Sequence, residues 1–179
     1  MPTVLVLLAD GFEEIEAVTP IDLLRRAGAE VTIASLSATR ETTGRSRLTL
    51  RADTTLEEIG TTLFDAVFLP GGPGVKHLRS DPRVRDLLVR HAAADRWVTA
   101  ICAAPAVLHD AGLLAGRRYT AHDSVATELP AAIADEKVVR DGPILTSRGA
   151  GTALDFGLSL VALLFSQAKA DELARAICR

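Results

Sequence analysis

Of the two cysteines in the chain, only Cys102 has a sequence context that favours a reactive thiol. It follows the apolar segment Trp97–Ile101 and precedes Pro105, and proline is typical of the first turn of a helix. A side chain at such a strand-to-helix turn points out of the sheet, as in a nucleophile elbow. The N–H groups and dipole of the helix would favour the thiolate, which is the nucleophilic form. A small buried hydrophobic residue is an equally good interpretation, and position alone leaves both open. Cys178, near the end of the chain, has no such context.

An acidic cluster follows the first apolar segment of the chain and contains Glu13, Glu14 and Glu16. Carboxylates favour the first turn of a helix by roughly 0.3–1 kcal/mol each, which explains Glu13 and Glu14. Glu16 could instead point back across the sheet edge toward Cys102. A carboxyl group beside a thiolate in a dry pocket has a raised pKa. We therefore interpret Glu16 as a candidate general acid and base near neutral pH.

The dipeptide Gly71-Gly72 follows a third apolar segment, at residues 65–70. Glycine permits a tight turn, and the pair needs no other explanation. A functional interpretation adds the N–H of Gly72 as one oxyanion donor and the N–H of Ala103 as a second.

The histidines give a weaker signal. His122 follows the segment 118–121 and could join the same sheet edge, although a lone histidine is more often structural. His77, His91 and His109 have no partner that the sequence identifies. The spacing of His, Cys and carboxylate residues resembles no metal site, so we expect none. Residues 147–152 are rich in glycine but lack the Lys-Ser/Thr of a phosphate-binding P-loop, and we interpret them as a helix-capping turn.

These candidate residues must be positioned by a framework of alternating strands and helices. Such alternation predicts an α/β domain with a mostly parallel sheet and helices on both faces. No linker or repeat interrupts the chain, so we expect a single domain over residues 1–179. Because ligands bind at the carboxyl ends of parallel strands, the candidate residues should converge at one edge. We expect strands at 3–9, 31–36, 65–70, 97–101 and 118–121, hairpins at 40–50 and 137–147, and helices at 13–27, 82–94, 105–111, 153–165 and 168–177.

The helix expected at 13–27 has five apolar residues that we assign to its inward side. Pro20 interrupts this segment and should kink the helix or loosen its first turns. The inward residues are Ile15, Val18, Ile21, Leu23 and Leu24.

Composition limits the class of protein. Hydrophobic residues make up 48% of the 179 residues and aromatic residues 4%, so aliphatic side chains must build the core. A total of 20 basic against 23 acidic residues gives a net charge of −3, which argues against binding nucleic acid. Two cysteines do not make a disulfide scaffold, and no apolar run approaches the ~20 residues of a membrane span. We expect a soluble, cytoplasmic protein.

Four motifs occur in an order that resembles the ThiJ/PfpI superfamily, and within it the branch of the Parkinson-disease-associated protein deglycase and its bacterial homologues. The resemblance covers essentially the whole chain. It implies a flavodoxin-like three-layer sandwich of the class I glutamine amidotransferase-like type that forms homodimers. It also implies cofactor-free chemistry with a cysteine nucleophile. The motifs are Asp10-Gly-Phe-Glu-Glu-Ile-Glu16, Leu69-Pro-Gly-Gly72, Ala100-Ile-Cys-Ala-Ala-Pro105 and Leu145-Thr-Ser-Arg-Gly-Ala-Gly-Thr152.

Roles within the family carry over residue by residue. Cys102 matches the reactive elbow cysteine, and Glu16 matches the protonated carboxyl group that bonds its sulfur. Gly72, beside Gly71, and Ala103 match the oxyanion donors. The two remaining matches are His122, the nearby histidine, and Arg26, an arginine at the dimer contact near the site.

Two departures from the family pattern affect this assignment. Close relatives have Cys-Ser-Arg in the hairpin, with an arginine that reaches the cysteine pocket of the partner, where this chain has Gly44-Arg45-Ser46-Arg47. Arg45, Arg47 or neither could replace that arginine. Asp123 follows His122 where some relatives have proline, which leaves the orientation of the histidine open. The related intracellular peptidases place histidine directly after the cysteine; Ala103 in that place disfavours proteolysis.

The resemblance implies two alternative functions. The first is a glyoxalase III-like or protein deglycase activity, in which Cys102 forms a hemithioacetal with a 2-oxoaldehyde such as methylglyoxal or with a glycated side chain. The second is a redox-sensing or chaperone-like protein that uses oxidation of Cys102 without turnover. Both use the same residues, so the sequence does not separate them.

Overall fold

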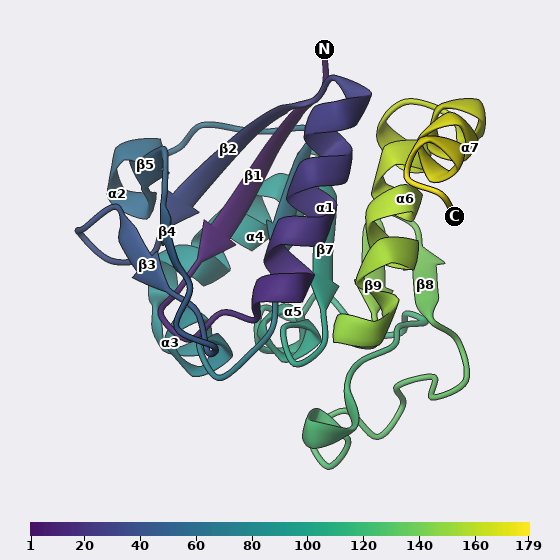
Figure 1. Ribbon diagram of the computed structural model, residues 1–179. Helices are drawn as coiled ribbons and strands as arrows, with labels where there is room; N and C mark the ends of the chain where they lie inside the picture. Colours follow the sequence, from purple (N-terminus) through teal and green to yellow (C-terminus); the bar gives the residue numbers. More distant parts are fainter.

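A seven-stranded sheet forms the centre of the computed structural model, which describes residues 1–179 (Figure 1). All neighbouring strands are parallel except β8 and β9, which form the antiparallel hairpin predicted at 137–147. The strand order is β5 (Thr54–Thr55), β2 (Glu30–Ser35), β1 (Thr3–Leu8), β6 (Ala66–Leu69), β7 (Trp97–Ile101), β9 (Ile144–Ser147) and β8 (Val138–Asp141).

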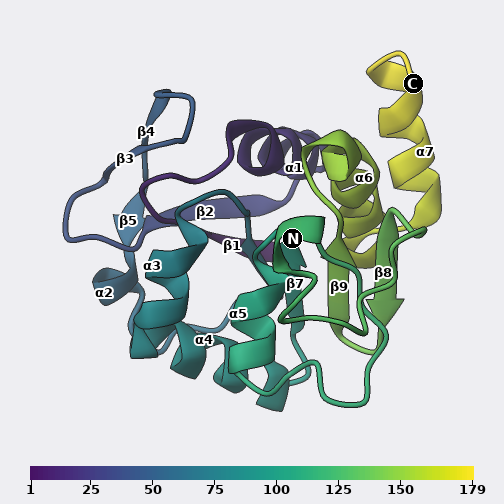
Figure 2. The ribbon, with the colours of Figure 1, turned by 90° about the horizontal axis from the view of Figure 1, so that it is seen from below.

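Helices cover both faces of the sheet, which gives the three layers seen edge-on in Figure 2. One face carries α1 (Glu14–Ala27), α6 (Ala153–Leu164) and α7 (Gln167–Ala176). The other carries α2 (Leu56–Ile59), α3 (Val75–Ser80), α4 (Pro82–Ala93) and α5 (Pro105–Asp110). This architecture confirms the predicted flavodoxin-like α/β sandwich.

The central strands β1 and β6 are almost wholly apolar because both of their faces are buried. In β1, Leu5 and Leu7 pack with one hydrophobic core, whereas Val4, Val6 and Leu8 pack with the other. The alternating direction of side chains in a strand thus divides one apolar run between two cores.

A topological switch point lies beside β1, which pairs with β2 on one side and with β6 on the other. Connections leave β1 and β6 toward opposite faces of the sheet, so a crevice opens at their carboxyl ends. Three of the segments singled out in the sequence follow β1, β6 and β7 and therefore meet at this crevice.

A separate two-stranded ribbon, β3 (Glu41–Thr43) with β4 (Thr49–Arg51), confirms the hairpin predicted at 40–50. Its tip is the five-residue segment Gly44–Leu48. The N–H of Gly11 donates to the carbonyl of Thr43 at 2.8 Å, so the ribbon lies against the segment that follows β1.

The inward side predicted for α1 needs one correction. Ile15 and Val18 are 54% and 43% exposed, so they do not belong to it. Ile21, Leu23 and Leu24 are buried as predicted, and Ala17 and Pro20 are buried with them. α1 continues through Pro20, which lies against Gly157 of α6.

The segment at 118–121 is not a strand. Its polar backbone groups find partners outside any ladder: the N–H of Arg118 donates to the Asp141 carboxylate at 2.8 Å, and the N–H of Thr120 donates to the Thr146 hydroxyl at 2.9 Å. The N–H of Ile133 donates to the carbonyl of Tyr119 at 2.9 Å. Hydrogen bonds to side chains and to a loop thus satisfy these backbone groups in place of a strand partner.

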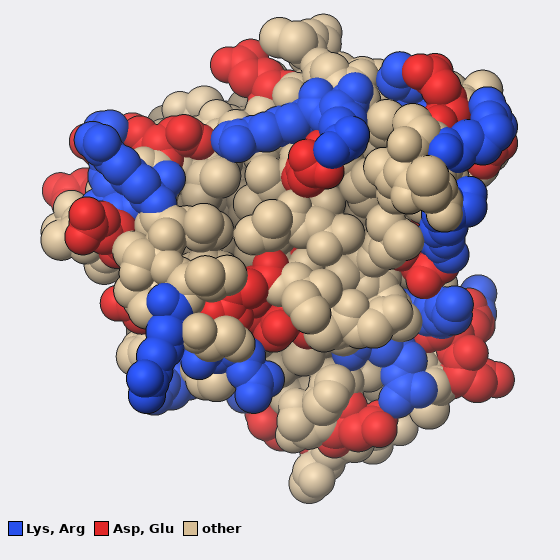
Figure 3. All heavy atoms as spheres, viewed as in Figure 1, with Lys and Arg blue, Asp and Glu red and all other residues tan.

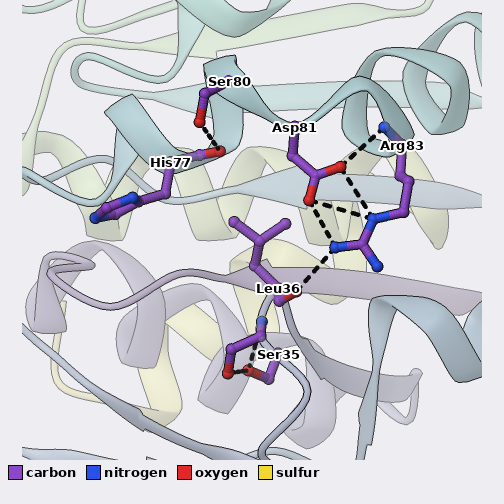
Figure 4. A network of polar contacts seen from close by, with 7 residues as sticks. Ser35, Leu36, His77, Ser80, Asp81 and Arg83 are labelled. Carbon is purple, nitrogen blue, oxygen red and sulfur yellow. Dashed lines mark hydrogen bonds and ion pairs between the residues drawn. The ribbon is translucent and has the colours of Figure 1, made fainter.

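The start of α4 is tied to the end of β2 by a polar network (Figure 4). Asp81 caps the helix by accepting the N–H of Arg83 at 3.0 Å, and its carboxylate pairs with the Arg83 guanidinium at 2.6 Å. The same guanidinium donates to the carbonyl of Leu36 at 3.3 Å. The short helix α3, which the sequence analysis missed, precedes this cap.

No helix of this protein combines the length and the apolar composition that crossing a bilayer requires.

Candidate functional site

Cys102 occupies a sharp turn between β7 and α5, where the sequence predicts an elbow. Its φ of 67° lies in the left-handed region, which is uncommon for a residue with a side chain and often marks a functional site. Two backbone bonds hold the turn: the N–H of Cys102 donates to the carbonyl of Ser147 at 2.9 Å, and its own carbonyl accepts from the N–H of His122 at 2.8 Å. The thiol is partly accessible, so it is not a core residue.

Glu16 reaches Cys102 from the first turn of α1 and is 1% exposed. One carboxylate oxygen accepts the N–H of Gly71 at 2.9 Å, and the carboxyl group lines the same cavity as Cys102. Glu13 is the N-cap of α1 and accepts the N–H of Glu16 at 2.8 Å. The cap orients the first turn so that Glu16 faces the sheet edge.

Burial sets the protonation of this pair. It raises the pKa of Glu16 to about 7; bonds to Cys102 and Gly71 oppose this rise, and the charge of Glu13 adds to it. Burial likewise raises the pKa of Cys102 to about 12, and repulsion from the Glu16 carboxylate is the next cause. This corrects the expectation of a thiolate stabilised by the helix alone. Glu16 is the group that titrates near neutral pH, and its protonation removes the repulsion that adds to burial in raising the pKa of the thiol.

The backbone N–H groups of Ala103 and Gly72 favour the thiolate and lower the pKa of Cys102, although they do not outweigh burial. Gly72 has a φ of 95°, and a Cβ there would lie 2.5 Å from the carbonyl oxygen of Gly11. Only glycine fits this turn without displacing the backbone. Gly72 and Ala103 thus line the Cys102 cavity from separate loops.

Gly71 must remain a glycine because its neighbours occupy the space for a side chain. A Cβ at this position would lie 2.6 Å from Cβ of Cys102 and 2.6 Å from Oε2 of Glu16. We expect Gly71→Ala to lower the free energy of unfolding by about 1–3 kcal/mol and to slow alkylation of Cys102 by iodoacetamide. Gly151→Ala is the matched control because its Cβ would meet nothing within 4 Å. Thermal unfolding and the rate of Cys102 alkylation are measured for both variants. Equal changes in Gly71→Ala and Gly151→Ala would contradict the prediction.

His122 lies beside the site, and its exposed side chain lines the same cavity as Cys102. Its Nδ1 accepts the N–H of Ser124 at 3.1 Å, so a neutral ring has its proton on Nε2. His122 therefore contributes one possible hydrogen-bond donor to the residues around the cavity.

The cavity around these groups has a volume of about 440 Å³. A larger groove of about 840 Å³ lies against α6 and α7, but Cys102 and Glu16 do not line it. The chemistry therefore belongs to the smaller cavity. Its walls are formed by Glu13, Glu16, Arg45, Gly72, Pro73, Cys102, Ala103, His122, Ser124 and Ala150.

Arg45 is the wall residue whose place in the site the sequence left open. Arg26, by contrast, does not line the cavity: it lies exposed on α1, where its Nε pairs with Asp22 at 2.6 Å. Glu14, assigned only to the helix start, is buried and accepts the N–H of Ser46 at 2.7 Å. No sequence signal could reveal that contact, because it joins residues 32 positions apart.

The site holds no group of ligands for a metal. The structure contains no group of three or more His, Cys, Asp or Glu side chains arranged to hold an ion. The reactive groups of the cavity are a thiol, a carboxyl and backbone donors. This set is suited to addition of sulfur to a carbonyl group.

Comparisons with known proteins agree with this geometry. The sequence profile of the DJ-1/PfpI family matches residues 2–163. The chain is 37% identical to protein DJ-1 homolog A of Arabidopsis thaliana over 98% of its length, but spans only 45% of that relative. It is 33% identical to the glutathione-independent glyoxalase DJR-1.2 of Caenorhabditis elegans, covering 93% of this chain and 90% of the relative. The crystal structure of Drosophila melanogaster DJ-1beta superposes with a TM-score of 0.95 at 36% identity, covering 98% and 97% of the two chains.

Proposed function

Since the chain belongs to the DJ-1/PfpI family, we propose that it is a cofactor-independent cysteine enzyme that converts 2-oxoaldehydes such as methylglyoxal and glyoxal into 2-hydroxy acids. One observation carries the proposal. Glu16, a buried carboxyl group whose pKa burial raises to about 7, lines one cavity with Cys102, Gly72 and Ala103. A nucleophile, a proton carrier and oxyanion donors are thereby present in one cavity.

The first step is addition of sulfur to the aldehyde. The Cys102 thiol passes its proton to the Glu16 carboxylate while the sulfur attacks the aldehyde carbon, C1, and the C1 oxygen becomes an oxyanion. The N–H groups of Gly72 and Ala103 stabilise that charge. Glu16 then returns its proton to the oxygen, which gives a neutral hemithioacetal.

The second step moves hydrogen between adjacent carbons. The Glu16 carboxylate removes the proton from C1 to give an enediolate with its charge on the C2 oxygen. Glu16 returns that proton to C2, and the hydroxyl proton of the C1 oxygen passes to the C2 oxygen, which gives a thioester. His122, which lines the same cavity, would donate a hydrogen bond to the C2 oxygen. Water then cleaves the C–S bond and releases lactate from methylglyoxal. C1 is oxidised and C2 is reduced within one molecule, so no external redox cofactor is needed.

The same addition chemistry supports action on glycated protein side chains. An early adduct of methylglyoxal with a thiol or amine releases the aldehyde reversibly, and Cys102 would capture the aldehyde as the same hemithioacetal. A protein deglycase activity therefore requires no residue beyond those of the glyoxalase reaction.

We also propose a homodimer formed through the face that contains α1 and α6. Figure 3 shows a broad area without charged side chains in the middle of this face. Exposed Ile15 and Val18 belong to α1, and large exposed apolar areas mark interaction surfaces. Arg26, which also lies on α1, would then reach the partner subunit instead of its own Cys102.

A second function, redox sensing, is favoured by the partial accessibility of the Cys102 thiol. Attack of the sulfur on a peroxide transfers one oxygen, releases water and gives a sulfenic acid, which a second peroxide converts to a sulfinic acid. Glu16 and the N–H groups of Gly72 and Ala103 would bond those added oxygens.

The test of the enzymatic proposal is direct detection of product. We expect the purified protein, without glutathione, to convert methylglyoxal into lactate, observed by proton NMR. Methylglyoxal incubated without protein is the control. Absence of lactate above that control would overturn the glyoxalase proposal.

A further inference from the structure

Arg45 is the one lysine or arginine among the residues that line the Cys102 cavity. It stands at the tip of the β3–β4 ribbon and reaches the cavity of its own chain. Its charge acts on the site, since it lowers the pKa of Glu16 against the larger effect of burial.

The chain itself fixes the ribbon tip against the cavity. The N–H of Arg45 donates to the carbonyl of Phe12 at 2.8 Å, and the N–H of Ser46 donates to the Glu14 carboxylate at 2.7 Å. Gly44 packs so closely on Glu14 that a Cβ would lie 2.3 Å from its Oε1. Arg45 thus begins from an anchored backbone and needs no partner subunit to reach the cavity.

The guanidinium of Arg45 is available to a ligand. It is exposed and, unlike Arg26 with Asp22 or Arg148 with Asp123, forms no ion pair and no side-chain hydrogen bond. The two carboxyl groups that line the cavity already have backbone partners: Glu13 accepts the N–H of Glu16, and Glu16 accepts the N–H of Gly71. An unpaired cation at the mouth of a cavity attracts an anionic group.

The cavity also has room for a molecule larger than methylglyoxal. Its 440 Å³ equals the liquid volume of roughly 15 water molecules, whereas methylglyoxal has only five non-hydrogen atoms. A longer molecule could place its aldehyde on Cys102 and its far end beside Arg45.

We propose that Arg45 is the anion-binding residue of the Cys102 cavity and that it makes the enzyme select 2-oxoaldehydes carrying a carboxylate. This inference rests on the proposed function for the identity of the substrate. The binding of an anion near Cys102 does not depend on turnover, so it can be tested separately.

The first experiment compares kcat/KM for 4,5-dioxopentanoate, an anionic 2-oxoaldehyde, with kcat/KM for methylglyoxal. We expect the wild-type preference for the anion to fall about three- to tenfold in Arg45→Gln, to be partly retained in Arg45→Lys, and to weaken with added salt. Arg47→Gln is the matched control, since it removes the same charge from the same ribbon tip without lining the cavity. An unchanged preference in Arg45→Gln, or an equal fall in Arg47→Gln, would overturn the proposal.

The second experiment requires no turnover. Iodoacetate and iodoacetamide alkylate the same sulfur, form the same C–S bond and release iodide, but only iodoacetate is an anion. We expect the iodoacetate-to-iodoacetamide ratio of Cys102 alkylation rates to fall about three- to tenfold in Arg45→Gln and to remain unchanged in Arg47→Gln. A ratio that falls without any lactate formation would refute the glyoxalase activity and keep the anion site. An unchanged ratio would refute the anion site itself.

Discussion

A Cys102→Ala protein is expected to lose lactate formation from methylglyoxal by at least about 10³-fold, to the uncatalysed background. Without the sulfur no hemithioacetal forms, and the N–H groups of Gly72 and Ala103 then have no covalent adduct to stabilise. The residual carboxyl of Glu16 cannot replace the nucleophile. The measurement is the initial rate of lactate release at saturating methylglyoxal.

Cys178→Ala is the matched control, because Cys178 is the other free cysteine and lies exposed beyond the end of α7. We expect it to keep the wild-type rate. Alanine keeps the Cβ of cysteine, so Cys102→Ala adds no strain at the φ of 67° and should unfold near the wild-type temperature. Lactate formation that survives in a folded Cys102→Ala protein would contradict the mechanism.

The same pair of variants addresses redox sensing. Under mild peroxide, intact mass should show two added oxygens on the wild type and on Cys178→Ala, and none on Cys102→Ala. Oxidation without any lactate formation would favour the sensor over the enzyme. If Cys102 is not selectively oxidised, the redox-sensing proposal is refuted and the enzymatic proposal is unaffected.

The strand ends of the site were predictable because their signals are local. An apolar run followed by Cys102 and then Pro105 fixes a strand, a turn and a helix start within nine residues. The same holds for Gly71-Gly72 after β6. Parallel strands bring such ends to one edge wherever each strand lies in the sheet, so their convergence follows from the fold class.

The contributions of the ribbon tip depend on distant packing and could not be predicted in this way. Arg45 and Ser46 lie in a polar segment whose composition is typical of any surface hairpin. The place of Arg45 at the cavity depends on the bond between the N–H of Ser46 and Glu14, which the sequence presents only as a carboxylate at a helix start. A short-range pattern contains no information about such a contact.

Two predictions made from the sequence were wrong for the same reason. In α1, apolar identity alone assigned Ile15 and Val18 to the core, although an exposed apolar residue is common and a surface for association can require it. At 118–121, side-chain acceptors such as Thr146 replace the strand ladder, and these acceptors come from another part of the chain. In both cases tertiary contacts override the local pattern.

A Glu16→Gln protein is expected to slow lactate formation by about 10²- to 10⁴-fold. Glutamine can still accept the N–H of Gly71, but it cannot take a proton from the thiol or from C1. The amide also preserves the volume of a side chain that is 1% exposed. Alkylation of Cys102 measured in parallel separates loss of proton transfer from loss of a reactive thiol. A rate within threefold of the wild type would exclude Glu16 as the proton carrier.

The same substitution should change how stability depends on pH. Burial raises the pKa of Glu16 from its ordinary value of 4.5 to about 7, so the folded protein binds this proton more tightly than the unfolded chain. The stabilisation is complete below pH 4.5 and is lost as pH rises through 7, a loss of about 3 kcal/mol. The glutamine of Glu16→Gln cannot ionise, so this variant should lack that loss. Between pH 4.5 and pH 8 its free energy of unfolding should therefore fall less than that of the wild type.

Urea denaturation of both proteins between pH 4.5 and 8 measures this difference. His91 also makes the stability of each protein depend on pH. It is buried and accepts the N–H of Phe64, and burial lowers its pKa. Its contribution to the free energy of unfolding is therefore lost as pH falls below 6.5, the ordinary pKa of histidine. Because both proteins contain His91, subtracting one curve from the other isolates Glu16. Glu57→Gln, a substitution of the same kind on the exposed surface of α2, should follow the wild-type curve. Parallel wild-type and Glu16→Gln curves would mean that the carboxyl titrates alike in the folded and unfolded states, and Glu16 could not then hold a proton for catalysis near neutral pH.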